Sequence, residues 1–112
     1  MAQNLLPAEG TAPGRLSGAG PGRFELTGAI GFTDAARLLA EGDAAFASLQ
    51  SVEVDLARIT RADSAGLALL IEWLLSARAA GRALRYCNVP PAVASLAGIS
   101  DVAELLSPSG GG

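Results

Sequence analysis

The stretch that decides the fold is VEVDLARITRADSAGLALL, residues 52–70. Its first five residues alternate between apolar and polar side chains, which predicts a half-buried β-strand there. Asp63 and Ser64 follow at the start of a helical pattern over 64–80, and either residue can cap that helix. The intervening residues 57–62 are expected to form a loop. The stretch therefore predicts a strand, a loop and a helix, with a serine hydroxyl where free backbone N–H groups can hold a phosphoryl group or another anion.

Three further elements are predicted upstream of this stretch. Alternation over 24–30 predicts a strand, which we expect to form a hairpin with a short strand near 15–17 through the turn-rich segment 18–22. Apolar residues at helical spacing over 35–49 predict a helix, with Thr33 as its N-cap. The upstream half thus contributes two strands and one helix.

Downstream, the pattern predicts three further elements. Gly81 ends the long helix, and residues 84–87 alternate as a strand. Pro90 and Pro91 begin a short helix, and a last helical segment follows over about 100–106. Each strand-helix-strand step favours a right-handed parallel crossover. The sequence therefore predicts an α/β fold, in which a small mixed β-sheet carries its helices mainly on one face.

The two ends of the chain show no periodicity. We expect residues 1–13 to be a flexible N-terminal tail and residues 107–112 a flexible C-terminal tail, because both are rich in small residues and proline. One folded domain is expected over 14–106. The length of 112 residues and the hydrophobic content of 50% suit a single domain with a sizeable core.

The composition excludes several kinds of active site. All eight basic residues are Arg, and the chain has no His and one cysteine, Cys87, which we interpret as a buried small hydrophobe. A Walker lysine, a Schiff base, a His-based triad and a Cys/His zinc cluster all need side chains that are missing. Acid/base chemistry would have to use Asp55, Asp63 and Glu72, of which the last two lie about 13 Å apart by helical rise. We therefore expect no enzyme activity, no cofactor and no metal.

The net charge and the hydropathy pattern limit which partners and which cellular compartment we expect. The net charge of −3 and the absence of an arginine stripe argue against nucleic acid as a partner. The most apolar run, residues 65–71, ends at Glu72 and is too short to cross a membrane. No basic segment followed by a hydrophobic run marks a signal peptide. We expect a cytoplasmic protein without direct membrane insertion.

The run Asp63-Ser64-Ala65-Gly66-Leu67 resembles the Asp-Ser/Thr-x-Gly-Leu signature of the STAS domain family, and the order of elements agrees over about 23–106. Residues 60–73 and 77–81 are more similar to MlaB-type STAS subunits of the Mla phospholipid-transport ABC system, which maintains the lipid asymmetry of the outer membrane. This resemblance implies a non-catalytic subunit that binds and regulates the cytoplasmic ATPase subunit. Through the ATPase it would join the permease and lipid-binding subunits, peripherally at the inner membrane.

Ser64 is also compatible with a second function. In the anti-sigma factor antagonists of the same family, the residue that matches Ser64 is phosphorylated by a partner kinase, which is itself the anti-sigma factor. The Escherichia-type MlaB subunit carries Thr at this place, whereas this chain has Ser. The resemblance therefore leaves an alternative, an anti-sigma factor antagonist switched by phosphorylation of Ser64. A phosphate would add about −1.5 to −2 charge at pH 7 beside Asp63 and weaken docking, because its desolvation is costly.

The expected docking surface surrounds the start of the long helix and comprises Thr60, Arg61, Ser64, Leu69 and Trp73. On a helical wheel the main apolar arc faces the sheet, with Leu69 beyond one edge and Trp73 on the nearer shoulder. This arrangement predicts a partly exposed apolar rim near Ser64, which a partner could cover. The rim or the open face of the sheet would also allow a weak homodimer.

Overall fold

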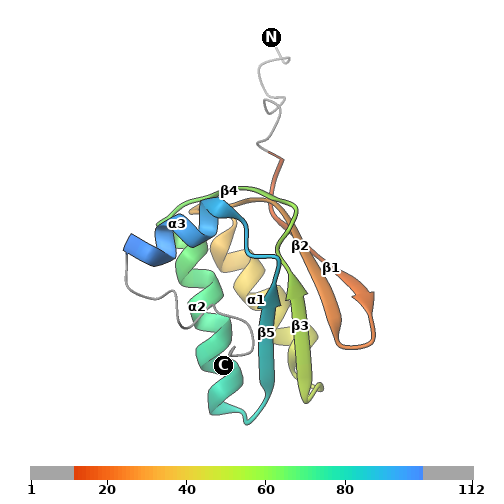
Figure 1. Ribbon diagram of the computed structural model, residues 1–112. Helices are drawn as coiled ribbons and strands as arrows, with labels where there is room; N and C mark the ends of the chain where they lie inside the picture. Colours follow the sequence, from red (N-terminus) through yellow and green to blue (C-terminus); the bar gives the residue numbers. More distant parts are fainter. Residues whose placement is uncertain (1–11, 100–112) are drawn as a thin grey trace.

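The computed structural model describes residues 12–99, and it confirms the predicted mixed α/β fold (Figure 1). The expected helical segment 100–106, the tail 107–112 and residues 1–11 lie outside the described residues. In chain order the elements are β1 (Arg15–Gly20), β2 (Arg23–Ile30), α1 (Ala35–Phe46), β3 (Ser51–Asp55), β4 (Ile59–Ala62), α2 (Ser64–Ala79), β5 (Ala83–Cys87) and α3 (Pro91–Ile99).

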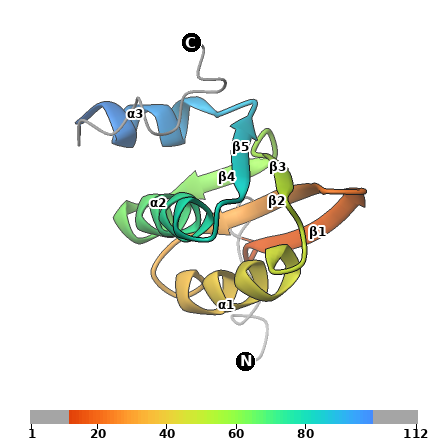
Figure 2. The same cartoon turned by 90° about the horizontal axis from the view of Figure 1, so that it is seen from below.

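The strands form one mixed sheet in the order β1-β2-β3-β5, and β4 pairs with β2. β1 and β2 form the expected antiparallel hairpin, while β3 runs parallel to both β2 and β5. Seen along β3 and β5, α1 and α2 lie against the same face of the sheet, and α3 lies beside α2 and β4 (Figure 2). Within residues 12–99 no helix covers the opposite face, as the alternating strands predicted.

The core lies between the sheet and the helices α1 and α2. Leu26 and Val54 point into it from neighbouring strands and are fully buried. Trp73 of α2 is 1% exposed and packs edge-on against Phe46 of α1, with ring centroids 5.4 Å apart. Gly42 of α1 makes room for the indole, since a Cβ at this position would overlap the Trp73 ring. The contact between Gly42 and Trp73 therefore fixes how closely the two helices pack.

The open face of the sheet is polar. Glu53 of β3 lies between Arg23 and Arg85, at 3.8 Å and 3.1 Å, and Glu25 of β2 pairs with Arg58 at 3.4 Å. The arginines are largely exposed and the glutamates are partly exposed, so each pair contributes at most about 1 kcal/mol to stability. The strands thus place apolar residues in the core and charged residues on the other face, which is the alternation read from the sequence.

The prediction of a loop over residues 57–62 is wrong for its last four residues. Ile59–Ala62 form β4, which pairs in parallel with the last residues of β2. Four residues with a single buried apolar side chain, Ile59, are too short for alternation to reveal a strand. The pairing with β2, which is distant in sequence, decides their conformation.

The predicted N-cap and the predicted end of the first helix are also wrong. Asp34, not Thr33, precedes α1, because its carbonyl accepts the first helical hydrogen bond, from the N–H of Leu38 at 2.9 Å. The Asp34 carboxylate makes no cap bond and instead binds the Arg37 guanidinium at 2.9 Å. The helix ends at Phe46 rather than at residue 49.

Candidate docking site

Two loops meet at the end of the molecule where β4 lies (Figure 1). Residues 31–34 join β2 to α1, and Asp63 joins β4 to α2, so both helices begin at this end. Together with Pro13 and Arg61, the two loops line a hollow of about 410 Å³. The motif singled out in the sequence therefore lies beside the start of a second helix.

Asp63 is the N-cap of α2. Its Oδ1 accepts hydrogen bonds from the N–H groups of Ala65 and Gly66, at 2.8 Å and 3.1 Å. Its Oδ2 accepts a third hydrogen bond, at 3.2 Å, from the N–H of Phe32 in the loop before α1. Of the two residues that could cap the helix, Asp63 does so, and it also holds the neighbouring loop.

Ser64 is the first residue of α2 and is exposed. Within residues 12–99 its hydroxyl has no hydrogen-bond partner. The anion site expected beside it is not supported by the geometry, because Asp63 already accepts from two of the first-turn N–H groups. The structure therefore presents Ser64 as an accessible hydroxyl next to a carboxylate.

The sequence reasoning missed Phe32, which is 83% exposed. It lies in the loop 31–34 and lines the same hollow as Arg61 and Asp63. The available signal was its position, since it is an apolar residue after Gly31 that belongs to neither the strand pattern before it nor the helical pattern after it. An aromatic side chain exposed to this extent at one end of the molecule is suited to contact with a partner.

Comparison with protein-family models shows to which family this fold and motif belong. A model described as "Mlab, STAS domain" matches residues 17–107, which is most of the chain. The chain belongs to the STAS domain family. This membership confirms the resemblance drawn from Asp63 to Leu67, and the matching model is the MlaB-type one. Comparison with curated proteins gives no match.

Solved structures with the same fold include anti-sigma factor antagonists. The unphosphorylated form of SpoIIAA is 14% identical with a TM-score of 0.66, and the comparison covers 84% of this STAS domain chain and 85% of that one. An anti-sigma factor antagonist from Mycobacterium paratuberculosis is 16% identical with a TM-score of 0.66, over 90% and 87% of the two chains. At these identities the likeness establishes the shared fold.

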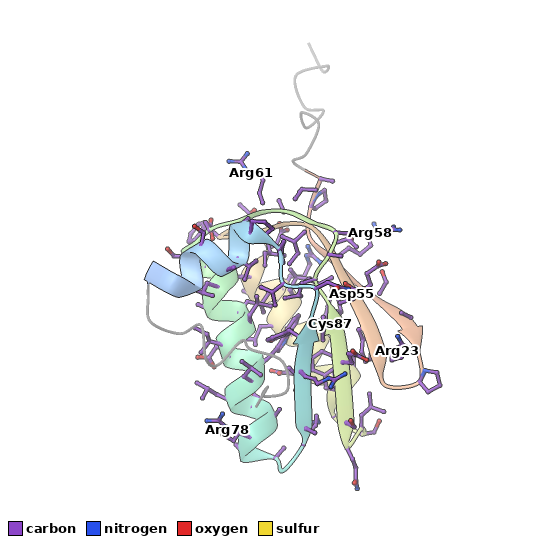
Figure 3. The ribbon with its side chains drawn as sticks, in the orientation of Figure 1. Arg23, Asp55, Arg58, Arg61, Arg78 and Cys87 are labelled. Carbon is purple, nitrogen blue, oxygen red and sulfur yellow. The ribbon has the colours of Figure 1, made fainter. Side chains whose placement is uncertain are left out.

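Thr60 and Arg61, both predicted to bind a partner, lie on β4 and are exposed. Arg61 projects from the same end of the STAS domain as the hollow, whereas Arg78 lies toward the other end of α2 (Figure 3). Thr60 lines a separate hollow with Arg15 and Arg58. The structure thus brings Arg61 to the Ser64 end and places Thr60 on the adjoining side.

The expected apolar rim of Leu69 and Trp73 is wrong. Leu69 is 3% exposed and Trp73 is 1% exposed, so neither offers a surface to a partner. The helical wheel assumed that α2 is covered on one side only. In the structure, α3 also packs against α2, and Leu69 shares the core with Val93 of α3. In α2 the exposed large apolar residue is Leu75, at 45%.

Hydrogen bonding keeps the Asp63 carboxyl ionised to low pH. The N–H of Gly66 is the main cause of its lowered pKa, and the N–H groups of Phe32 and Ala65 lower it further. A lowered carboxyl pKa adds stability above the unfolded-state value of about 3.9, and this stability is lost as the pH falls through the folded-state pKa. We therefore expect the NMR signals of the Phe32 and Gly66 amides to move only below about pH 4. A transition of both signals between about pH 5 and 7 would contradict this assignment.

Three further expectations concern membrane spans, metal ions and Cys87. Over residues 12–99 no helix has the length and apolar character to cross a membrane. No group of three or more His, Cys, Asp or Glu in this part of the chain could hold a metal ion. Cys87 was expected to be buried, but it is half-buried, because it belongs to the open face of the sheet and alternates with the buried Tyr86.

Proposed function

We propose that this STAS domain is the non-catalytic subunit of a bacterial phospholipid-transport ABC complex of the Mla type, and that it binds and regulates the cytoplasmic ATPase subunit. The observation that carries the proposal is the exposed Phe32, which is hydrogen-bonded to Asp63 of the family motif next to the exposed Ser64, in a chain matched by the MlaB-type model. In this proposal the protein is cytoplasmic and reaches the inner membrane through the transporter. The permease and the lipid-binding subunit are contacted through the ATPase.

The energetics favour docking through the end of the molecule that carries Phe32. Complete burial of a phenylalanine side chain contributes about 1.5 to 3 kcal/mol, which is roughly tenfold or more in affinity. Arg61 at the same hollow can pair with a carboxylate of the partner. Asp63 is engaged by three backbone N–H groups, so it supports this surface and is not available as a general base.

Paired substitutions at Ser64 test whether this end of the molecule binds the ATPase. We expect Ser64→Ala to bind the purified ATPase subunit with nearly wild-type affinity, because it removes a hydroxyl without a partner. Ser64→Glu should bind at least about tenfold more weakly, since docking would desolvate a second carboxylate beside Asp63. Calorimetric titration of each variant against the ATPase measures both effects.

Ser48→Glu is the matched control for the Ser64 pair, because Ser48 is exposed beyond the far end of α1. It should bind like the wild type. Wild-type affinity for both Ser64 variants would remove Ser64 from the interface, and failure of the wild-type chain to bind the ATPase would overturn the proposed function.

The alternative function is an anti-sigma factor antagonist switched by phosphorylation of Ser64. The accessible and unpartnered hydroxyl of Ser64 favours it, because a kinase could reach this group without local unfolding. Incubation with host lysate and ATP distinguishes the two functions. A stoichiometric phosphate on Ser64 supports the switch, whereas recovery of the chain with an ABC ATPase, a permease and a lipid-binding subunit supports the transporter.

A further inference from the structure

We propose that Asp63 is the positioning residue of the docking site, and that its carboxylate holds the Phe32 loop in the orientation that the partner binds. This inference rests on the proposed function, because it concerns the surface that would meet the ATPase. It assigns to Asp63 a role beyond capping α2. The structural part of the inference concerns the free chain and can be tested without any partner.

The two carboxylate oxygens of Asp63 serve two different elements. Oδ1 binds the first turn of α2 through Ala65 and Gly66, while Oδ2 binds the N–H of Phe32. The start of α2 therefore fixes the Asp63 side chain, and the second oxygen is left to fix the loop. Gly31 allows this approach, since a Cβ at that position would lie 2.7 Å from Oδ2.

The other end of the loop is held separately. The carbonyl of Gly31 accepts from the N–H groups of Asp34 and Ala35, at 3.0 Å and 2.9 Å, which starts α1. The Asp34 carboxylate binds Arg37, and the Arg37 guanidinium also donates to the carbonyl of Gly14 at 2.8 Å. Between these anchors, the hydrogen bond from Phe32 to Asp63 ties the exposed aromatic residue to α2.

Loss of this single hydrogen bond should free Phe32 without unfolding the domain. An exposed side chain on a mobile loop must be ordered when it binds, and that ordering lowers affinity. A loop that is ordered beforehand avoids this cost. Asp63 would therefore raise the affinity for the partner through the loop that it holds, and its effect would require the Phe32 side chain.

Two substitutions of Asp63 distinguish its positioning of the Phe32 loop from its capping of α2. Asp63→Ser keeps a good N-cap, but its single short hydroxyl cannot serve both α2 and the loop. Asp63→Asn keeps one acceptor oxygen for the cap, and its amide nitrogen cannot accept from the Phe32 N–H. Thermal unfolding should show both variants folded, because serine and asparagine cap helices about as well as aspartate.

The first measurement is the NMR order parameter of the Phe32 amide in the free chain. We expect it to fall from the range of a rigid backbone, about 0.85, to below about 0.6 in both variants. The Ala57 amide is the matched internal control, because its N–H also donates to an exposed carboxylate, that of Asp55, at 2.9 Å. It should not change. An unchanged order parameter for Phe32 in both variants overturns the inference, whatever the partner is.

The second measurement is a double-mutant cycle of Asp63→Ser and Phe32→Ala, read as affinity for the purified ATPase subunit. Asp63→Ser alone should weaken binding about tenfold, and it should have less than about a twofold effect when Phe32 is already alanine. Additive effects would overturn the positioning role. Absence of ATPase binding by the wild type overturns the proposed function instead, and the order parameter then still decides whether Asp63 holds the loop.

Discussion

Replacement of Trp73 with alanine is expected to lower the free energy of unfolding by about 3 to 5 kcal/mol. The indole is 1% exposed, packs against Phe46 and fills the space opposite Gly42, so its removal leaves a cavity between α1 and α2. Its Nε1–H also donates to the carbonyl of Leu39 at 3.5 Å. Urea unfolding followed by circular dichroism measures the loss.

Phe32→Ala is the matched control, because it removes an aromatic side chain that is 83% exposed. It should change the unfolding free energy by no more than about 0.5 kcal/mol. Together, the two variants also test whether Trp73 is a core residue or part of a docking surface. If Trp73→Ala kept full stability and lost only the partner, the indole would belong to an interface after all.

Replacement of Gly66 with alanine is expected to destabilise the domain by about 1 to 2 kcal/mol net. Helix propensity alone predicts the opposite, a gain of up to about 1 kcal/mol. Packing decides the sign, because a Cβ at this position would overlap the backbone carbonyl of Ile30 at the end of β2. Backbone atoms cannot rotate away, so α2 must shift, at a cost of about 1 to 3 kcal/mol or more. Thermal unfolding measures the change.

Gly18→Ala provides the comparison for Gly66→Ala. Gly18 lies in β1, and a Cβ there would have nothing within 4 Å. Its substitution should leave stability within about 0.5 kcal/mol of the wild type. Equal stability of both alanine variants would show that α2 does not approach β2 as closely as described.

The fold was largely predictable because most elements carry their own periodic pattern. The alternation in β2 and β3 and the caps at both ends of α2 define them locally, and the structure agrees closely with each. β4 could not be predicted, since its four residues become a strand only through pairing with β2. The packing of α3 against a second side of α2 could not be predicted either. Its apolar residues extend round the helix, and only the position of α3 shows that Leu69 is buried.

The candidate site was predictable only in part. The motif located Ser64 and Asp63 correctly at the start of α2, because helix caps have recognisable residues. Phe32 precedes Asp63 by 31 residues, and the hydrogen bond that joins them depends on how β2 and β4 lie side by side. No local pattern encodes such a contact. The exposed aromatic residue therefore became visible only in the folded chain.

The polar open face of the sheet makes Cys87 a useful attachment point for a spectroscopic reporter. It is the single thiol of the chain, and it lies with Glu53 and Asp55 on the face that carries no helix within residues 12–99. Partial burial is the main cause of the raised pKa of Cys87, and the hydrogen bond to Glu53 raises it further. Labelling of this thiol therefore calls for mildly alkaline buffer. A fluorophore there would lie in a hollow that shares no lining residue with the hollow lined by Phe32 and Asp63. Binding at that hollow could then be followed in a chain that needs no engineered cysteine.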